Sequence, residues 1–546
     1  MNFIANESAK KLRGGYYTPE DLATFLCKWV LEKKPTKVLE PSCGDGIFFK
    51  ALGNAGVDKN LSVIAIEFDE LEASKAKSRA QQAGLKSSKI HVADFLSWSL
   101  DMTGQNEASF DAVIGNPPFI RYQYLPTLFQ EKAEQVFHEL KLPFTKHTNA
   151  WVPFILASMR MLKPGGRLAM VVPAEIIHVM HAQSLRTYLG NECSKIVIID
   201  PEELWFDGTL QGAVLLMAEK RKAQSDHADG LAIYEVKNRE FLRKEPAYIF
   251  SCAQPINGKS IQGKWTSALL DKETRELFEE LREHQEIYKF SDVADVDVGI
   301  VTGANKFFLV TDDVVAKNGL ERWAHPMFGR SEHCPGIIYD AKQHASNAAA
   351  GKPTNFLWFP DNEPMRYKKP RAYIESGEAE SLHTRYKCRI RQRWFSVPSV
   401  YSAEIGMLKR SNNYPRLILN KLGAFTTDTA YRIKCKNGVS PEKLVGCFFN
   451  SLTALSAELE GRHYGGGVLE LVPSEIEKLI VPVPKNIRIN LKALDKKIRT
   501  QNSDSVLEES SKPIFDEIGL SRAKQERVIN GWKSLRNRRQ RISSEE

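Results

Sequence analysis

The sequence lacks the features that mark membrane, secreted and zinc-binding proteins. It has no run of about 18 apolar residues that could form a membrane-spanning helix. Its first residues, MNFIANESAKKLRGG, lack the apolar segment of a secretory signal. The eight cysteines are scattered, with no CxxC pair and no His/Cys cluster at zinc spacing. We therefore expect a cytoplasmic protein with reduced cysteines, no metal and no membrane partner.

The composition is that of a globular protein with a large core and a basic surface. Of the 546 residues, 42% are apolar and 26% are charged, which is ordinary for a well-packed protein. The net charge of +9 suits a polyanionic partner, although many basic enzymes never bind nucleic acid. The position of the charge in the chain is therefore more informative than its total.

Apolar runs alternate with helix-length segments from Lys37 to about Lys220. Short runs of Val, Ile and Leu separated in this way predict parallel strands covered on both faces, as in a doubly wound α/β sheet. Beyond residue 222 the alternation stops and a loop-rich region begins. We expect a first domain over residues 1–240, a second over 241–490 and a basic helical tail over 491–546.

Three consecutive predicted strands end in an acidic residue. VLEPSCGDGIF places Glu40 before a loop in which Gly44 and Gly46 let the backbone approach a ligand. The next strand ends at Glu67, where a carboxylate can bind both hydroxyls of a ribose. The third is followed by Asp94, which can accept a hydrogen bond from an adenine amino group. Because open α/β sheets bind ligands at this edge, the sequence predicts a ligand site there.

The order YYTPEDLA, LEPSCGDG, IEFD, ADF, NPPF and LKPGG…VVP resembles the gamma arrangement of S-adenosylmethionine-dependent DNA amino-methyltransferases of prokaryotic restriction-modification systems. The resemblance covers residues 14–220. It implies a class I methyltransferase fold with a Rossmann-like, mostly parallel seven-stranded sheet, followed by a mixed α+β target-recognition domain. It also implies that S-adenosylmethionine is bound by Thr18, Glu40, Pro41, Ser42, Cys43, Gly44, Gly46, Glu67, Phe68, Asp94, Phe95, Asn116 and Pro118.

Two of these positions allow an additional interpretation from the residues themselves. Thr18 is expected to cap a helix whose first residue is Pro19, because threonine accepts hydrogen bonds from the first turn and proline fits its first position. Phe95 is expected to cover the adenine ring that Asp94 binds.

The segment GNPPF carries the expected chemistry. Proline has no amide donor, so Pro117 and Pro118 should end the strand and stiffen the turn. The lone pair of an exocyclic amine is delocalised into the base, so it must be drawn toward sp³ character before it can accept a methyl group. The Asn116 side-chain oxygen and the Pro117 carbonyl can accept the two amine hydrogens and aim the lone pair at the methyl donor.

Aromatic rings are expected beside this turn. A base inside a duplex cannot reach the turn, so the target nucleotide must be flipped out. Phe119 presents a ring for stacking and completes the catalytic set of Asn116, Pro117 and Phe119. The resemblance assigns the second stacking ring to Phe206, with the adjacent Trp205 as an alternative.

The identity of the target atom is a separate question. Asn116 favours adenine N6, and cytosine N4 stays an alternative. Methylation of cytosine C5 needs a nucleophilic cysteine, usually in a Pro-Cys pair, and the chain has none. Similar turns occur in methyltransferases of protein glutamine and of ribosomal RNA guanine. A silent DNA-binding subunit is the non-enzymatic alternative, and the intact NPPF turn disfavours it.

The second half of the chain points to nucleic acid. YKCRIRQRWFSV predicts a strand with Arg389, Arg391 and Arg393 on one face and packed residues on the other. Arginines in such a row suit phosphate contacts or bidentate reading of guanine, and a solvated strand face is the alternative. Further DNA contacts are expected at Arg121, Tyr122, Thr302, Asn305, Lys306, Arg462 and His463.

No nuclease signature of the PD…ExK kind accompanies these motifs, and they begin by residue 18. We therefore expect a stand-alone, site-specific DNA adenine N6-methyltransferase that uses S-adenosylmethionine and no metal. Its expected partners are double-stranded DNA and a separate restriction endonuclease that acts on the same site.

Overall fold

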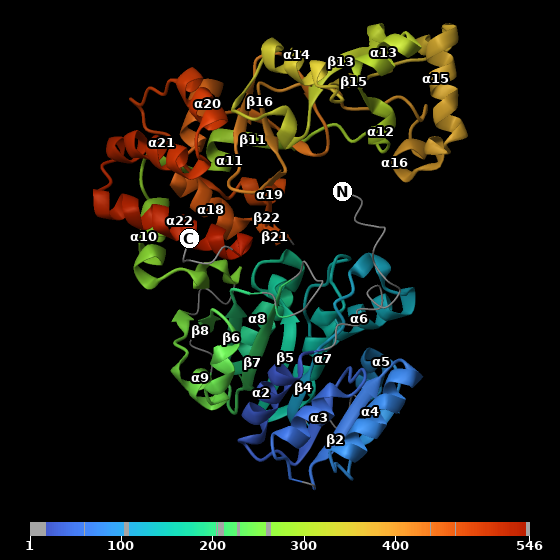
Figure 1. Ribbon diagram of the computed structural model, residues 1–546, viewed down its shortest axis with the longest axis vertical. Helices are drawn as coiled ribbons and strands as arrows, with labels where there is room; N and C mark the ends of the chain where they lie inside the picture. Colours follow the sequence, from blue (N-terminus) through green and yellow to red (C-terminus); the bar gives the residue numbers. More distant parts are fainter. Residues whose placement is uncertain are drawn as a thin grey trace. The chain divides into compact units, whose positions relative to one another are not determined.

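A computed structural model describes residues 18–58, 60–102, 109–203, 205, 212–226, 230–257, 264–436, 438–464 and 466–541 (Figure 1). The chain divides into two compact units, Met1–Leu269 with Arg541–Glu546 and Leu270–Gln540. The expected boundary at residue 240 lies inside the first unit, because α9 (Pro246–Cys252) and β9 (Ile256–Asn257) belong to it. The strand β9 pairs with the edge of the first unit's sheet.

The first unit is built on one nine-stranded sheet in the order β3-β2-β1-β4-β5-β7-β6-β8-β9. Strands β1 to β5 are parallel to their neighbours within that group, as β6 is to β8, whereas β7 and β9 run antiparallel. The remaining bounds are β1 (Lys37–Glu40), β2 (Ser62–Glu67), β3 (Lys89–Val92), β4 (Phe110–Gly115), β5 (Leu162–Pro173), β6 (Cys193–Pro201), β7 (Ala213–Lys220) and β8 (Gly230–Val236).

The mostly parallel α/β sheet is confirmed, and it has two strands more than the seven expected. The extra strands are β8 and β9, which continue the sheet beyond β6. The sequence GLAIYEV pairs in parallel with β6 in full register, so it extends the sheet although it follows the point where the alternation of strands and helices stops.

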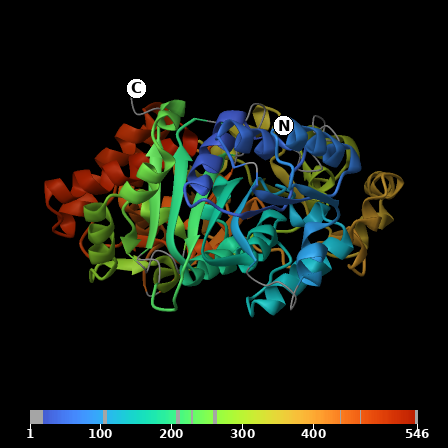
Figure 2. The ribbon, with the colours of Figure 1, turned by 90° about the horizontal axis from the view of Figure 1, so that it is seen from below.

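Helices cover both faces of this sheet (Figure 2). Successive residues of β1 point to opposite sides: Val38 joins the core shared with α2, α3 and α4, and Leu39 joins the core shared with α5, α7 and α8. Burial on both sides explains the continuous apolar runs. The helices are α2 (Glu20–Leu31), α3 (Ile47–Asn54), α4 (Glu70–Gln82), α5 (Phe95–Asp101), α6 (Thr127–Glu139), α7 (Trp151–Met161) and α8 (Gln183–Glu192), with 3-10 turns η1 (Tyr122–Tyr124), η2 (Ala174–Ile177), η3 (Met180–Ala182), η4 (Arg239–Arg243) and η6 (Trp265–Leu269).

The second unit combines small sheets with helices, as expected for a mixed α+β domain. Its sheets have the strand orders β10-β23, β11-β20-β16-β18-β14, β12-β15-β13-β19 and β17-β22-β21. The strands are β10 (Ile287–Lys289), β11 (Ala294–Val298), β12 (Leu309–Val310), β13 (Ala324–Phe328), β14 (Ile338–Tyr339), β15 (Asn355–Leu357), β16 (Ile405–Leu408), β17 (Arg410–Ser411), β18 (Leu417–Asn420), β19 (Phe425–Thr426), β20 (Ala430–Cys435), β21 (Arg462–Tyr464), β22 (Val468–Glu470) and β23 (Ile480–Pro482).

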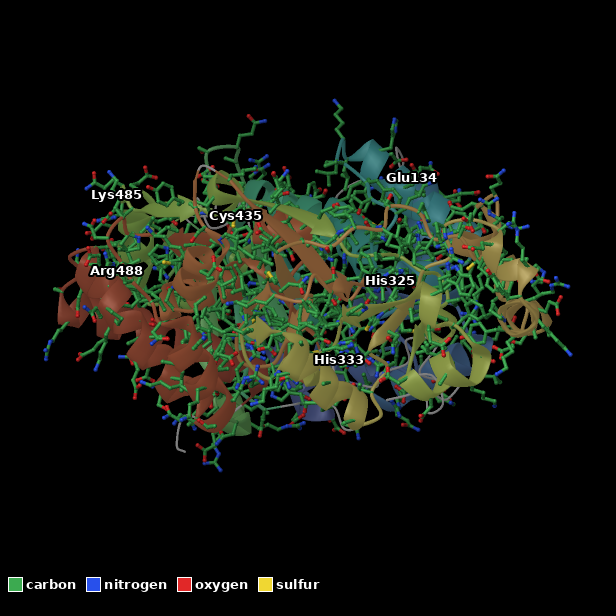
Figure 3. The ribbon with its side chains drawn as sticks, turned by 90° about the horizontal axis from the view of Figure 1, so that it is seen from above. Glu134, His325, His333, Cys435, Lys485 and Arg488 are labelled. Carbon is green, nitrogen blue, oxygen red and sulfur yellow. The ribbon has the colours of Figure 1, made fainter. Side chains whose placement is uncertain are left out.

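Helices and 3-10 turns lie between the strands of this unit along the chain. His333, labelled in Figure 3, is buried at the end of η8, and burial lowers the pKa of its imidazole to about 4, so it is a neutral part of the core. The helices are α10 (Lys272–Arg282), α11 (Phe290–Val293), α12 (Asn305–Phe308), α13 (Asp312–Asn318), α14 (Ala341–Ala349), α15 (Lys368–Ala379), α16 (Tyr386–Arg389), α17 (Pro441–Phe448), α18 (Ser451–Glu460), α19 (Pro473–Ile476), α20 (Leu491–Thr500), α21 (Ser503–Glu517) and α22 (Arg522–Gln540), with 3-10 turns η7 (Glu321–Trp323), η8 (Ser331–His333), η9 (Glu363–Arg366) and η10 (Leu382–Thr384).

The C-terminal helices belong to the core of the second unit. Residues 491–540 are mostly helical, as expected for the tail, but they pack as part of this unit. Trp532 of α22 is buried, and Arg539 of the same helix forms an ion pair of 2.6 Å with the buried Glu458 of α18. Much of the positive charge of this segment therefore has a partner inside the protein.

The predicted basic strand around Arg389 is wrong. Residues Tyr386–Arg389 form the short helix α16, and turns follow it. Ile390, expected on the packed face, is 61% exposed. Arg391 donates hydrogen bonds to the carbonyl oxygens of Val301 and Thr302. A two-residue period over so few residues cannot distinguish a strand from a turn of helix, and local spacing does not reveal the bonds of Arg391 to carbonyls that are distant in sequence.

We expect Gly46→Ala to destabilise the first unit. Gly46 precedes α3 with a φ of +87°, and an added Cβ would lie 2.7 Å from the Ala76 Cα of α4. The combined backbone strain and clash should lower the free energy of unfolding by about 3 kcal/mol or more, measured by urea denaturation.

Gly84→Ala is the matched control for this change. Gly84 also has a positive φ, +72°, but no described atom lies within 4 Å of the added Cβ. It should cost only about 1 kcal/mol, the strain alone. Equal losses in the two variants would show that the close approach of α4 to Gly46 has no energetic consequence.

Candidate active site

Polar side chains lie together at the carboxyl edge of β1 to β4. Glu40 is the last residue of β1, Glu67 is the last of β2, and Asp94 follows β3 and caps α5. Asn116 directly follows β4. Because these strands are parallel neighbours in the order β3-β2-β1-β4, their ends share one edge of the sheet. The acids thus lie at consecutive strand ends, as the sequence predicted.

Glu40 is a buried acid. Its side chain is 0% exposed, and neither carboxyl oxygen has a hydrogen-bond partner among the described residues. Burial raises the pKa of this carboxyl well above its usual value, and the negative charges of Glu67 and Asp45 raise it further. Such a group is costly to bury unless a donor or a cation approaches it. Glu40 therefore suits a ligand that brings an N–H or cationic group.

The loop after β1 is fixed by Glu67. Its Oε2 accepts a hydrogen bond from the Gly44 amide at 2.8 Å, and its Oε1 accepts one from the Asp69 amide at 2.9 Å. Gly44 has a φ of +52°, and no described atom lies within 4 Å of the place a Cβ would take. Burial raises the pKa of the neighbouring Cys43 thiol, so this thiol is neutral. The loop leaves space for a ligand beside its backbone.

The two phenylalanines assigned to the cofactor lie in different environments. Phe68 follows β2 with its side chain 79% exposed, so its ring is available to a ligand. Phe95 is only 2% exposed and packs against Phe154, with 5.1 Å between the ring centroids. The expectation that Phe95 covers an adenine ring does not fit this packing, because its ring is part of the hydrophobic core. Asp94 beside it caps α5 by accepting a hydrogen bond from the Ser97 amide at 2.8 Å.

The NPPF turn contacts the loop after β1. β4 ends at Gly115, as predicted, and the Ser42 hydroxyl donates a hydrogen bond to the Asn116 carbonyl oxygen at 3.0 Å. Gly115 lies close to Pro41, since a Cβ added there would be 3.4 Å from the proline Cδ. Phe119 is half-buried and packs against both cores of the first unit. The turn and the ligand loop are therefore one connected structure.

Thr18 does not cap the first described helix. α2 begins at Glu20, and Pro19 occupies the cap position without a side-chain hydrogen bond. Thr18 is buried, and its hydroxyl has no partner among the residues that the structure describes. Pro19 precedes the helix with a φ of -55° and an extended ψ of 136°, so the cap position lies one residue later than the sequence predicted. The Thr18 hydroxyl thus keeps its hydrogen-bonding capacity for a ligand.

The structure describes one of the two candidates for the second stacking ring. Phe206 lies outside the described residues. Trp205, the alternative, is 3% exposed and stacks on Phe241 with 5.8 Å between ring centroids. Its ring is used in packing within the first unit and does not face solvent.

Some of the predicted DNA-contacting side chains are bonded to other residues of the protein, and others are exposed. Arg462 forms an ion pair with Glu475 at 3.0 Å, and His463 lies 3.5 Å from a carboxylate oxygen of Glu458. Thr302 is buried and its hydroxyl is bonded to the Asn305 side chain. In the first unit, Tyr122 is half-buried. Exposed side chains among these candidates are those of Arg121, Asn305, Lys306 and Arg389, with Arg393 half-buried against Ser396.

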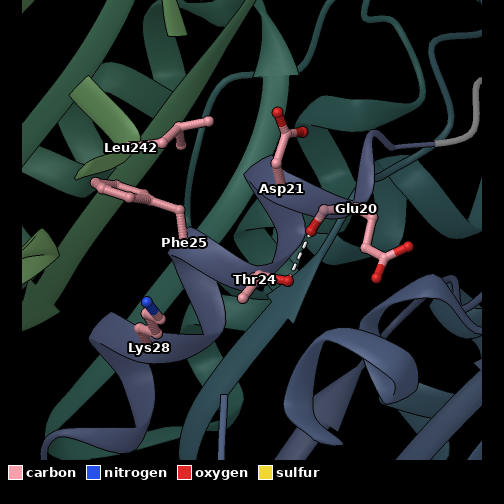
Figure 4. A pocket seen from close by; sticks show the side chains of 6 residues that line it. All are labelled: Glu20, Asp21, Thr24, Phe25, Lys28 and Leu242. Atoms are coloured by element: carbon pink, nitrogen blue, oxygen red, sulfur yellow. Dashed lines mark hydrogen bonds between the residues drawn. The ribbon is translucent and has the colours of Figure 1, made fainter. Parts of the chain in front are cut away.

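A hollow of about 400 Å³ on α2 does not coincide with this edge. It is lined by Glu20, Asp21, Thr24, Phe25, Lys28 and Leu242 (Figure 4). None of the predicted cofactor residues is among them. It is therefore a separate feature of α2 and η4, and we assign it no part in cofactor binding.

Sequence reasoning did not identify two polar residues near the turn. Asn149, just before α7, and Glu175, just after β5, are joined by a hydrogen bond of 2.9 Å. An acid two residues after the strand AMVVP repeats the spacing of Asp94 after β3, and that signal could have identified Glu175.

The sequence pattern of the N-6 DNA Methylase family matches residues 1–307, more than half of the chain. The chain belongs to the N-6 DNA methylase family. A second pattern, that of the C-terminal domain of the type II methyltransferase M.Eco57I, matches residues 262–515. The predicted adenine-specific DNA methyltransferase activity and its cofactor, S-adenosylmethionine, are confirmed by this membership.

Two relatives match this N-6 DNA methylase over most of their own length. It is 26% identical over 523 residues to the type II methyltransferase M.AccI of Acinetobacter calcoaceticus, across 92% of this chain and 89% of the relative. It is 23% identical to M.XamI of Xanthomonas campestris pv. amaranthicola, across 87% and 86%. The crystal structure of the type IIG restriction endonuclease BpuSI is similar with a TM-score of 0.43 and 12% identity, across 98% of this chain and 67% of that one.

The residues of the methylase fit its cofactor. S-adenosylmethionine carries an amino group, ribose hydroxyls and an adenine ring, and Glu40, Glu67 and Phe68 offer a buried acid, a strand-end carboxylate and an exposed ring. Within the described ranges, no group of three or more His, Cys, Asp or Glu side chains could hold a metal ion. Among the same residues, no helix is long and apolar enough to cross a membrane.

We expect Glu40→Gln to change how stability depends on pH. In the cofactor-free protein the Glu40 carboxyl keeps its proton above its usual pKa of 4.5, whereas in the unfolded chain it ionises. The folded state then binds more protons, so the wild type loses stability relative to the variant as pH rises from 5 to 8, by at most about 1.4 kcal/mol per pH unit. Urea denaturation across this range measures the difference.

Glu134→Gln, at an exposed position of α6, is the matched control and should leave the slope unchanged. Glu40→Gln should also weaken cofactor binding in calorimetry, because the buried acceptor loses its capacity for negative charge. Parallel pH curves for the wild type and Glu40→Gln would contradict the assignment of a protonated, buried acid.

Proposed function

We propose that Asn116 and Pro117 hold the N6 amine of a flipped-out adenine while Phe119 stacks on its ring. The Asn116 side-chain oxygen and the Pro117 carbonyl accept the two amine hydrogens, which leaves the lone pair directed away from the turn. Both acceptors stabilise the positive charge that develops on nitrogen. The amine needs no strong base, because its acidity rises as the new bond forms. The proton then leaves through these acceptors to solvent.

The hydrogen bond from Ser42 to the Asn116 carbonyl carries this proposal. It joins the acceptor turn to the loop beside Glu40 and Glu67, so amine and cofactor are held in one frame. S-adenosylmethionine, when bound, supplies an electrophilic methyl group. Positioning two reactants in this way supplies a large part of the rate. We assign the amino-acid end of the cofactor to Thr18, Glu40 and the loop, and the nucleoside end to Glu67, Phe68 and Asp94.

The modification role follows from the same proposal. Several relatives are named type II methyltransferases, and two of them align over most of their length. We propose that this chain protects one short DNA sequence from a separate restriction endonuclease. The endonuclease would cut only the unmethylated form of that sequence.

DNA from cells that express the protein should carry N6-methyladenine at one short sequence, detected by base-resolved sequencing. Asn116→Ala should abolish this signal, with a fall in the methyl-transfer rate of about 100-fold or more from the loss of one acceptor. Its dissociation constant for S-adenosylmethionine should stay close to that of the wild type.

Near-normal transfer by Asn116→Ala would refute the acceptor role. Absence of modified adenine in wild-type cells would refute the proposed function as a whole. The proposed endonuclease partner is tested by cleavage: an endonuclease that cuts the unmodified sequence should fail to cut the modified DNA.

We propose that α16 is part of the DNA-binding surface of the second unit. Tyr386 is 63% exposed, and Lys387 and Arg389 lie over its ring at 5.6 and 5.7 Å from the centroid. An aromatic ring flanked by two cations suits a sugar-phosphate backbone. Arg391, by contrast, is bonded to the carbonyls of Val301 and Thr302 and supports the local fold.

Reversing two charges on this helix, Lys387→Glu with Arg389→Glu, should weaken DNA binding in a salt-dependent way. The slope of log affinity against log salt should fall by about 2 if both contact phosphates. Fluorescence anisotropy with a labelled duplex measures it.

The matched control is Lys496→Glu with Lys512→Glu, two exposed positions on α20 and α21 that change the net charge equally. Equal loss of affinity in both double variants would show that only total charge matters. Unchanged affinity in the α16 variant would show that this helix is not part of the DNA-binding surface.

A further inference from the structure

Glu175 lies at the same edge of the sheet as the catalytic turn, one strand away. It belongs to η2, which directly follows β5, and β5 is the parallel neighbour of β4. Its Oε1 accepts hydrogen bonds from the Asn149 side-chain amide at 2.9 Å and from the Trp151 indole at 3.0 Å. The Trp151 ring is buried at the start of α7. One carboxylate oxygen therefore fixes two side chains from a segment that is distant in sequence.

Asn149 transmits this restraint to the chain that leaves the catalytic turn. Its side-chain oxygen accepts a hydrogen bond from the Tyr122 amide at 3.2 Å, while the Ala150 amide donates to the Ile120 carbonyl at 2.9 Å. Tyr122 is three residues beyond Phe119. The segment after the NPPF turn is thus attached to the start of α7 at two points, one of which depends on how Glu175 orients the asparagine amide.

The backbone around Glu175 is itself held in place. Arg186 of α8 is buried and donates hydrogen bonds to the carbonyl oxygens of Ile176 and Val179, both at 2.9 Å. The Ala174 amide donates to the Gly212 carbonyl at 2.8 Å. The backbone that carries Glu175 is therefore held at both ends of η2, so its carboxylate is a rigid reference point.

We propose that Glu175 is a positioning residue for base binding, acting through Asn149 on the segment that follows Phe119. This inference rests on the roles proposed for Asn116, Pro117 and Phe119. Glu175 keeps the asparagine carbonyl turned toward the Tyr122 amide and thereby fixes where the stacking ring and the acceptor oxygens meet the adenine. Cofactor binding, at the ends of β1 to β3, does not depend on it.

A reciprocal exchange of the two side chains tests the proposal. Asn149→Asp removes the amide donor and places a second carboxylate against Glu175, so the pair should separate. Adding Glu175→Gln restores a hydrogen bond in the opposite direction. The glutamine amide then donates to the introduced aspartate, whose other oxygen can still accept from Tyr122, and the glutamine oxygen can accept from Trp151.

We expect Asn149→Asp to lower the single-turnover rate of methyl transfer about tenfold or more through misplacement of the base. The duplex carries the sequence found by sequencing. With 2-aminopurine at the target position, fluorescence should show less flipped base. Hydrogen exchange of the peptide spanning residues 116–125 should accelerate. The cofactor dissociation constant should be unchanged, and the double variant should recover rate, fluorescence and exchange protection.

A normal transfer rate in Asn149→Asp would overturn the positioning role, even if exchange accelerates. A slow Asn149→Asp that the second change does not rescue would overturn it as well, because a general loss of packing would then suffice. Failure of the proposed function is recognised separately, since it requires that the wild-type protein transfer no methyl group to adenine.

Discussion

Burial of a parallel sheet on both faces is the constraint on which the catalytic unit depends. When helices cover both sides, polar groups that must meet a ligand can lie only at the ends of strands. Glu40 is the most constrained of these groups, because its carboxyl is buried without a partner among the described residues. Burying this carboxyl costs free energy, and a charged ligand that binds there can offset that cost. The loop after β1, the NPPF turn and the residues just before α2 also contain candidate ligand-binding residues.

The catalytic unit could be predicted from sequence to a large extent. Its strands are continuous apolar runs, and the residues with chemical roles come directly after them, so short motifs locate them. Errors arose where one residue type serves two purposes. Phe95 follows Asp94 in the motif, where a ring over the adenine was expected, yet its ring packs in the hydrophobic core. Thr18 has the side chain of a helix cap, yet Pro19 occupies the cap position and the helix begins one residue later, at Glu20.

The second unit could be predicted only as a class of domain. Its arginines were interpreted as a DNA surface from local spacing, but several are paired with groups that are remote in sequence. Arg391 binds carbonyls about ninety residues earlier, and Arg539 binds Glu458. An arginine that is bonded to another group of the protein is less available to bind DNA. Local patterns contain no information on such long-range pairing, whereas three-dimensional structure does.

The short outer strands of the nine-stranded sheet have a consequence for solubility during folding. An open sheet exposes unpaired amides and carbonyls along its two outermost strands, and another chain can add a strand there. Here β3 has four residues and carries Lys89 and His91, while β9 has only two. Each margin therefore offers few hydrogen bonds to a neighbouring molecule, and the large sheet is protected against growth into intermolecular aggregates.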